Sequence, residues 1–207
     1  MKASLELLDE SLRFYAKNFL LLGGIFLIPT AVDIAGSLMS LGFLGDIASI
    51  VVSTFSYIAL IIAIDNPKGI GTIQNAYKAS TPLFFNYLCV SLIVGLLVML
   101  GLFALILPGL LFLVWFVTSS FVVVLEKRGI KDTLTQSREY VRGKWSPVFG
   151  RLVVLGLFLF VVISLFAFLS AVTGLGESGV YIIAWLLTPL SYIYLYLLYK
   201  EIKAHAA

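Results

Sequence analysis

Long apolar runs and short polar segments alternate along this chain. The apolar runs cover residues 19–39, 47–64, 84–106, 108–125, 148–172 and 180–199. A helix needs about 20 apolar residues to cross the hydrocarbon core of a bilayer, and each run is close to that length. The pattern therefore predicts an all-α polytopic membrane protein, in which one domain, residues 1–207, places six transmembrane helices in three hairpins.

Two features interrupt the apolar runs. Residues 83–124 carry no charged side chain, and one helix of that length would be about twice as long as the hydrocarbon core is thick. We expect Pro108 and Gly109 to divide this run, with Pro108 in the first turn of the second helix, where its missing N–H is harmless. Pro29 and the glycines after it predict an irregular link over residues 36–46.

Three polar segments precede apolar runs, at residues 4–17, 72–80 and 126–147. The first has apolar residues at positions 5, 8, 12 and 15, which is the spacing of one helix face. We interpret all three as amphipathic helices on the cytoplasmic membrane surface. They also show a faint threefold repeat, in which Leu8-x-x-Ser11, Ile73-x-x-Ala76 and Leu134-x-x-Ser137 lead to Phe19, Phe84 and Trp145.

Positive charge is confined to one side of the predicted topology. All fourteen Lys and Arg lie near the amino end, in residues 65–84, in residues 126–151 or in the tail. The opposite links hold only acids, such as Asp46 and Glu177. Because positively charged loops stay in the cytoplasm, both termini are predicted to be inside the cell.

Composition agrees with a membrane location. Hydrophobic residues make up 61% of the chain and charged residues 12%, about half the roughly 25% of an average soluble domain. A soluble protein of this composition would expose large apolar patches and aggregate. There is no long basic tail, Gly-rich phosphate loop or basic-aromatic groove, which argues against nucleic acid as a partner.

The segment LPGLLFLVWFVTSSFVVVLEKRGIKDTLTQSREYVRGKW resembles a pattern in a family of membrane domains. This family includes the membrane domain of glycerophosphoryl diester phosphodiesterases and stand-alone, uncharacterised prokaryotic six-helix membrane proteins. The matching positions are Pro108, Gly109, Glu126, Gly129, Ser137 and Gly143. The phosphodiesterase domain is absent, so the resemblance implies a multi-pass architecture in a prokaryotic plasma or inner membrane and a lipid-related setting, but no hydrolysis.

Catalytic chemistry has little support in the residues. The sequence has no metal-binding His pair, no Gly-x-Ser-x-Gly turn and no paired aspartates within the spans. Its single histidine, His205, lies in the polar tail. We therefore expect a non-catalytic protein without catalytic residues, metal or cofactor, which binds lipid or a partner protein and organises the bilayer or a membrane complex.

The basic segment supplies the candidate binding residues. Arg138, Arg142 and Lys144 are predicted to face lipid head groups, and Trp145 lies at a predicted interface, where amphipathic rings are favoured. Anionic lipid contributes about 1 kcal/mol for each basic residue near the surface. The alternative is that these charges only set the orientation. Small residues in 47–64 could likewise serve packing within the chain or self-association.

Asp33 is the acid that falls inside a predicted span. Acids at such depth often mark an ion or substrate path, which makes a small-solute transporter with Asp33 as an intramembrane acid the alternative function. The competing interpretation is that Pro29 bends or ends the span and leaves Asp33 in a wet outer segment. Pro29, Pro108, Gly109, Gly129 and Gly143 are predicted to be structural positions.

Overall fold

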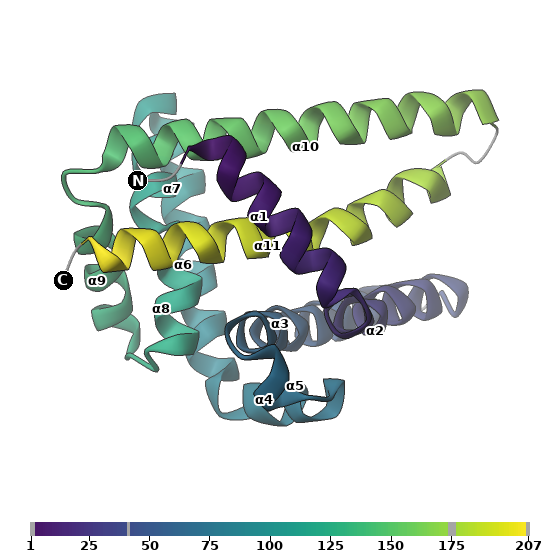
Figure 1. The fold of residues 1–207 in the computed structure, drawn as a ribbon. Coiled ribbons are helices and arrows are strands. Elements are labelled where there is room, and N and C mark those ends of the chain that lie inside the picture. The colour runs from purple at the N-terminus through teal and green to yellow at the C-terminus, as the bar shows by residue number, and fades with distance from the viewer. Residues whose placement is uncertain (1–2, 41, 174–176, 206–207) are drawn as a thin grey trace.

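The computed structural model describes residues 3–40, 42–173 and 177–205, and every regular element in those ranges is a helix. Figure 1 shows the helices in chain order. They are α1 Ser4–Lys17, α2 Phe19–Leu38, α3 Phe43–Asp65, α4 Pro67–Ile70, α5 Ile73–Ser80, the short 3₁₀ turn η1 Thr81–Leu83, α6 Phe84–Ala104, α7 Ile106–Phe116, α8 Ser119–Leu125, α9 Ile130–Val141, α10 Trp145–Thr173 and α11 Glu177–Ala204.

Five helical stretches are long and apolar enough to cross a membrane. They are Phe19–Gly36, Phe43–Asp65, Ile73–Ala104, Ile106–Leu125 and Trp145–Thr173. These stretches confirm the all-helical class and have the character of a multi-pass membrane protein. The predicted sixth run, 180–199, falls within α11, and its first side chains lie outside the described residues.

Neighbouring long helices pack as pairs, α2 with α3, α6 with α7 and α10 with α11. In Figure 1, α10 and α11 run the length of the molecule, and α2 and α3 run lengthwise over the part away from the termini and α9. Helices α6 and α7 run crosswise at the end where the termini and α9 lie. The main core lies where α3, α8 and α11 meet. Its fully buried members include Ile58, Ile61, Val122, Ile193 and Leu198.

The link between α2 and α3 is shorter than predicted. Helix α2 continues through Pro29 to Leu38, and α3 begins at Phe43, so the expected irregular link over 36–46 is wrong. A proline inside a helix leaves the carbonyl four residues earlier without its usual N–H donor. Here that carbonyl belongs to Ile25, and the Tyr77 hydroxyl of α5 donates a hydrogen bond to it over 3.1 Å. The helix therefore continues past Pro29.

The turn between α6 and α7 consists of one extended residue, Leu105. Pro108 lies in the first turn of α7 as predicted, although the break comes three residues before it. The helices touch closely below the turn, since a Cβ added at Gly101 would lie 2.8 Å from the Gly109 Cα. Gly109 is thus required by the close approach of two backbones rather than by the turn.

The predicted span 108–125 is not one continuous helix. It breaks at Val117 and Thr118, between α7 and α8. The Ser119 hydroxyl bonds back to the Phe116 carbonyl over 2.6 Å, and the Ser137 hydroxyl of α9 donates to the Trp115 carbonyl over 2.8 Å. A side chain inserted into the helical hydrogen-bond ladder is a common cause of such a break.

The predicted surface segment 126–147 contains a shorter helix than expected. Helix α9 covers Ile130–Val141, and α10 already begins at Trp145. Gly143 separates them with φ +75°, a conformation that favours glycine. Gly129 caps the start of α9 in an extended conformation, with φ −65°, which other residues adopt equally well.

The three polar segments predicted to be amphipathic contain the helices α1, α5 and α9. Their repeat positions Ser11, Ala76 and Ser137 are all fully buried. The aromatic residues that follow at 19, 84 and 145 are the first residues of α2, α6 and α10. Each of these three helices therefore turns one small residue into the protein shortly before a long apolar helix begins.

Candidate functional site

Helix α9 packs against the break between α7 and α8 and is hydrogen-bonded to it. The hydroxyls of Ser137 and Thr118 lie 2.8 Å apart, and both residues are buried. Thr133 and Val141 are fully buried on the same side of α9. Because the buried hydroxyl and apolar side chains of α9 face inward, its charged side chains remain outside.

The four predicted binding residues have different surroundings. Arg138 is exposed, and its guanidinium lies 4.5 Å from the centre of the Trp115 ring, within cation–π distance. Arg142 is exposed where α9 ends. The Lys144 ammonium donates a hydrogen bond of 3.3 Å to the Ile202 carbonyl of α11, and Trp145 stacks on Phe149. Arg138 and Arg142 are therefore available to a surface ligand, whereas Lys144 helps to hold α11.

Glu126 anchors a cluster that sequence reasoning did not anticipate. One carboxylate oxygen accepts hydrogen bonds from Tyr140 at 2.7 Å, Tyr199 at 2.8 Å and Lys203 at 2.9 Å. The other accepts from Arg128 at 2.8 Å. We call these five residues the Glu126 cluster. It joins the end of α8 to α9 and α11.

Electrostatics hold the Glu126 cluster together. Burial by itself would raise the pKa of Glu126, but the hydrogen bonds from Lys203, Tyr140, Tyr199 and Arg128 outweigh burial and lower the pKa to about 2. Burial and the hydrogen bond to Glu126 raise the pKa of Tyr140 to about 12. Near neutral pH the carboxylate is thus charged and both tyrosines remain hydrogen-bond donors.

A second ion pair lies between α10 and α11. Arg151 donates to both carboxylate oxygens of Glu201, at 3.0 and 3.3 Å. The Arg151 side chain is only 5% exposed and that of Glu201 is 11% exposed. The sequence pattern does not indicate this pair, because the two residues are 50 positions apart. The arrangement is a bidentate internal clamp rather than a surface charge.

The clue that the sequence did hold was the tyrosine spacing of α11. Tyr196 and Tyr199 lie on one helix face, with Lys203 one further turn along. The Tyr196 hydroxyl donates to Asp65 at 2.6 Å, just as Tyr199 donates to Glu126. Both acids stand at or next to the carboxyl end of an apolar helix. The tyrosines of α11 therefore bind the ends of α3 and α8.

Asp33 lies within α2, on the opposite end of the α2–α3 pair from α5. It is exposed, accepts a hydrogen bond from the Ser49 hydroxyl of α3, and borders an open hollow of about 560 Å³. The hollow is lined by Asp33, Gly36, Ser40, Gly42, Gly45, Asp46 and Ser49. The structure therefore keeps Asp33 helical beyond Pro29 and gives it polar neighbours.

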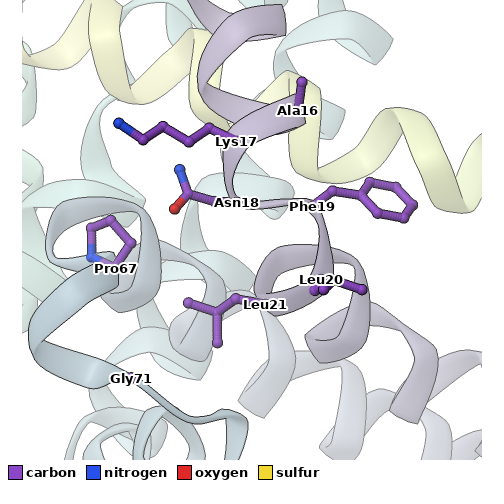
Figure 2. A pocket seen from close by; sticks show the side chains of 8 residues that line it. All are labelled: Ala16, Lys17, Asn18, Phe19, Leu20, Leu21, Pro67 and Gly71. Atoms are coloured by element: carbon purple, nitrogen blue, oxygen red, sulfur yellow. The ribbon is translucent and has the colours of Figure 1, made fainter.

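A hollow of about 330 Å³ lies where α1 meets α2, beside α4. Figure 2 shows Lys17 and Asn18 extending on the side of Pro67, while Phe19 points the other way. Leu20, at the rim, is 87% exposed. A cationic side chain therefore lies beside an exposed apolar one at this hollow.

No family model, curated protein or solved structure matches this chain, so the family resemblance of residues 107–145 stays a prediction.

Proposed function

We propose that this chain is a non-catalytic multi-pass membrane protein that binds anionic phospholipid at the end of the molecule that carries α9. In this proposal three helical pairs enter a prokaryotic cell membrane from the cytoplasmic side, and both termini and α9 lie inside the cell. The confinement of Lys and Arg to that side supports the orientation.

The observation that carries the proposal is the way α9 is fixed. Ser137 and Thr118 hold one face of the helix against the protein, and α10 begins only a few residues after α9 ends. The exposed residues Lys131, Arg138 and Arg142 are thereby held beside the entry of an apolar helix. Lipid phosphates lie at that level of a membrane, where basic side chains gain electrostatic attraction.

Retention of phosphatidylglycerol over phosphatidylcholine, measured by native mass spectrometry from a mild detergent, tests this function. Replacing Lys131, Arg138 and Arg142 together by Gln should weaken phosphatidylglycerol binding. The loss should be about 1 kcal/mol per residue, or roughly a hundredfold for the three. Lys144 stays unchanged because it holds α11.

The matched control removes charge of the opposite sign from the same helix. Asp132 and Glu139 are exposed on α9, and replacing them by Asn and Gln should leave phosphatidylglycerol retention equal or higher. If the triple-Gln variant and the wild type retained phosphatidylglycerol equally, the basic residues would serve only to set the orientation. That result would contradict the proposal.

The hollow at Asp33 supports a second candidate, a small-solute transporter. Asp33, Asp46 and Ser49 converge there on the side remote from α9. If Asp33 lies in a lipid-facing path, a hydrophobic carbodiimide should modify it in intact membranes and a water-soluble carbodiimide should not. Asp33→Asn should abolish the modification. Reaction with the water-soluble reagent would place Asp33 in a wet outer segment and remove the transport candidate.

A further inference from the structure

The turn of the α6–α7 pair differs chemically from the turns of the other two pairs. From Leu92 to Val117 the Trp115 indole is the only side chain with a hydrogen-bonding N–H or O–H group. The α2–α3 turn contains Ser40, and Asp46 follows it in the first turn of α3. The segment between α10 and α11 is flanked by Thr173 and Glu177. Two turns therefore carry groups that water solvates, and the middle one does not.

The side chains at the middle turn are also far from any protein cover. Phe103 is 86% exposed, Leu105 68%, Ile106 70% and Leu107 76%. Such a contiguous apolar surface is unstable in water. Within the turn, the Leu105 N–H donates a hydrogen bond to the Gly101 carbonyl, so this donor is satisfied without water. The surroundings that suit this tip are hydrocarbon chains.

The direction of the pair keeps its tip near the end of the molecule that carries α9. In Figure 1, α6 and α7 cross the lengthwise direction of α2, α3, α10 and α11, and they stay at the end where the termini and α9 lie. Helix α7 also packs against α10. If the lengthwise helices follow the membrane normal, a crosswise pair does not reach the far side.

Both ends of the pair are fixed on one side. Helix α6 follows α5 and its exposed Lys78 through a single 3₁₀ turn. At the other end, α8 runs directly into Glu126, which Arg128 and Lys203 neutralise. Charged groups of this kind stay in water or at head groups. The pair therefore enters and leaves through the same membrane surface.

We propose that α6 and α7 form a re-entrant hairpin whose turn ends among the acyl chains of the leaflet nearest α9. Its binding partner is the hydrocarbon of that leaflet. The third and fourth apolar runs then do not cross the membrane, while the remaining links keep the sides predicted from charge. The tight contact of Gly101 with Gly109 holds the two helices close together beside the turn.

Accessibility of single cysteines tests this proposal. In a Cys89→Ser background, Leu105→Cys is compared with Gly42→Cys in the α2–α3 link and with Gly129→Cys before α9. A membrane-impermeant maleimide is applied to spheroplasts, to inverted vesicles and after detergent. We expect Leu105→Cys to react only after detergent, Gly42→Cys to react in spheroplasts, and Gly129→Cys to react in inverted vesicles.

Comparing the three cysteine positions distinguishes a failure of the re-entrant hairpin from a failure of the proposed function. Reaction of Leu105→Cys on the same side and to the same extent as Gly42→Cys would overturn the re-entrant hairpin, whichever side proves to be outside. An exchange of sides between Gly42→Cys and Gly129→Cys would instead overturn the orientation in the proposed function and leave the hairpin intact.

Measuring the depth of residue 105 in the bilayer tests the hairpin independently of how fast the cysteine reacts with maleimide. A bimane group on Leu105→Cys should be quenched more strongly by lipids brominated on the acyl chains than by lipids that carry a quencher on the head group. The same label on Gly42→Cys is the control and should show the reverse order. Stronger head-group quenching at both positions would mean that the tip reaches the membrane surface.

Discussion

At the residue scale, a few polar side chains bind backbone carbonyls that lack their usual helical donor, and others link one helix to another. Tyr77 satisfies the carbonyl that Pro29 leaves without a partner, and Ser137 does the same for Trp115 at the α7–α8 break. Glu126 combines four donors at one carboxylate. Buried polar groups without partners cost free energy, so each of these contacts stabilises a local geometry on which a neighbouring helix depends.

Replacing Glu126 by Gln should lower the stability of the protein at neutral pH. The amide keeps one oxygen that can accept a hydrogen bond from tyrosine but loses the charge that binds Lys203 and Arg128, and hydrogen bonds to a charged group contribute about 1.5–3 kcal/mol. We expect a lower unfolding temperature in detergent, followed by tryptophan fluorescence. Glu139→Gln on the exposed face of α9 is the control and should change it little.

The Glu126 cluster also determines the direction in which the stability of the protein changes with pH. The pKa of Glu126 is lowered from 4.5 to about 2 by folding. A lowered pKa means that the stabilisation is fully present above pH 4.5 and is lost as pH falls toward 2. The wild type should therefore lose more stability than Glu126→Gln between pH 5 and pH 3. Parallel losses in the two proteins would show that Glu126 does not carry this charge effect.

At the element scale, the close contact between α6 and α7 depends on glycine. A Cβ at Gly109 would lie 2.4 Å from the Leu102 Cγ and 2.6 Å from the Leu102 backbone nitrogen. A flexible side chain can move away, but a backbone atom in a packed helix cannot do so without shifting the helix. The two helices of the middle pair are therefore matched to each other through these two residues.

Substitution of Gly109 by Ala should separate α6 from α7. Forcing an extra methyl group into a packed contact costs about 1–3 kcal/mol, which should appear as a lower unfolding temperature in detergent. Gly95→Ala is the matched control, because Gly95 lies in α6 and a Cβ there meets no atom within 4 Å. That variant should be neutral or slightly more stable, since Ala favours helix. Equal effects of the two substitutions would contradict the packing role of Gly109.

At the scale of the whole molecule, the sequence predicts the positions of the helices better than it predicts the contacts between them. Run lengths locate α2, α3, α6 and α10 within a few residues, because a long uninterrupted apolar run favours one continuous helix. The break at Val117 could not be predicted, since Ser137, which occupies it, is 20 residues away. The Glu126 cluster was missed for the same reason, because Tyr199 and Lys203 lie in a different helix.

For the candidate binding surface too, the sequence indicates the helix but not its contacts with other helices. The pattern of α9 indicated which residues are basic and that one face is apolar, and the structure places that apolar face against α7 and α8. It did not indicate that Lys144 binds a carbonyl of α11 while Arg138 lies on Trp115. Which basic residues remain available to lipid depends on partners that approach only in three dimensions.

The two ionic contacts of α11 have a consequence for biosynthesis. Glu126 and Arg151 leave the ribosome well before Lys203 and Glu201, with which they pair. During that interval Arg151 lacks its acidic partner, and Glu126 has only Arg128 of its two basic partners. Arrival of α11 supplies both counter-charges. The ion pairs that fix α11 to the earlier helices can therefore form only after α11 has been translated.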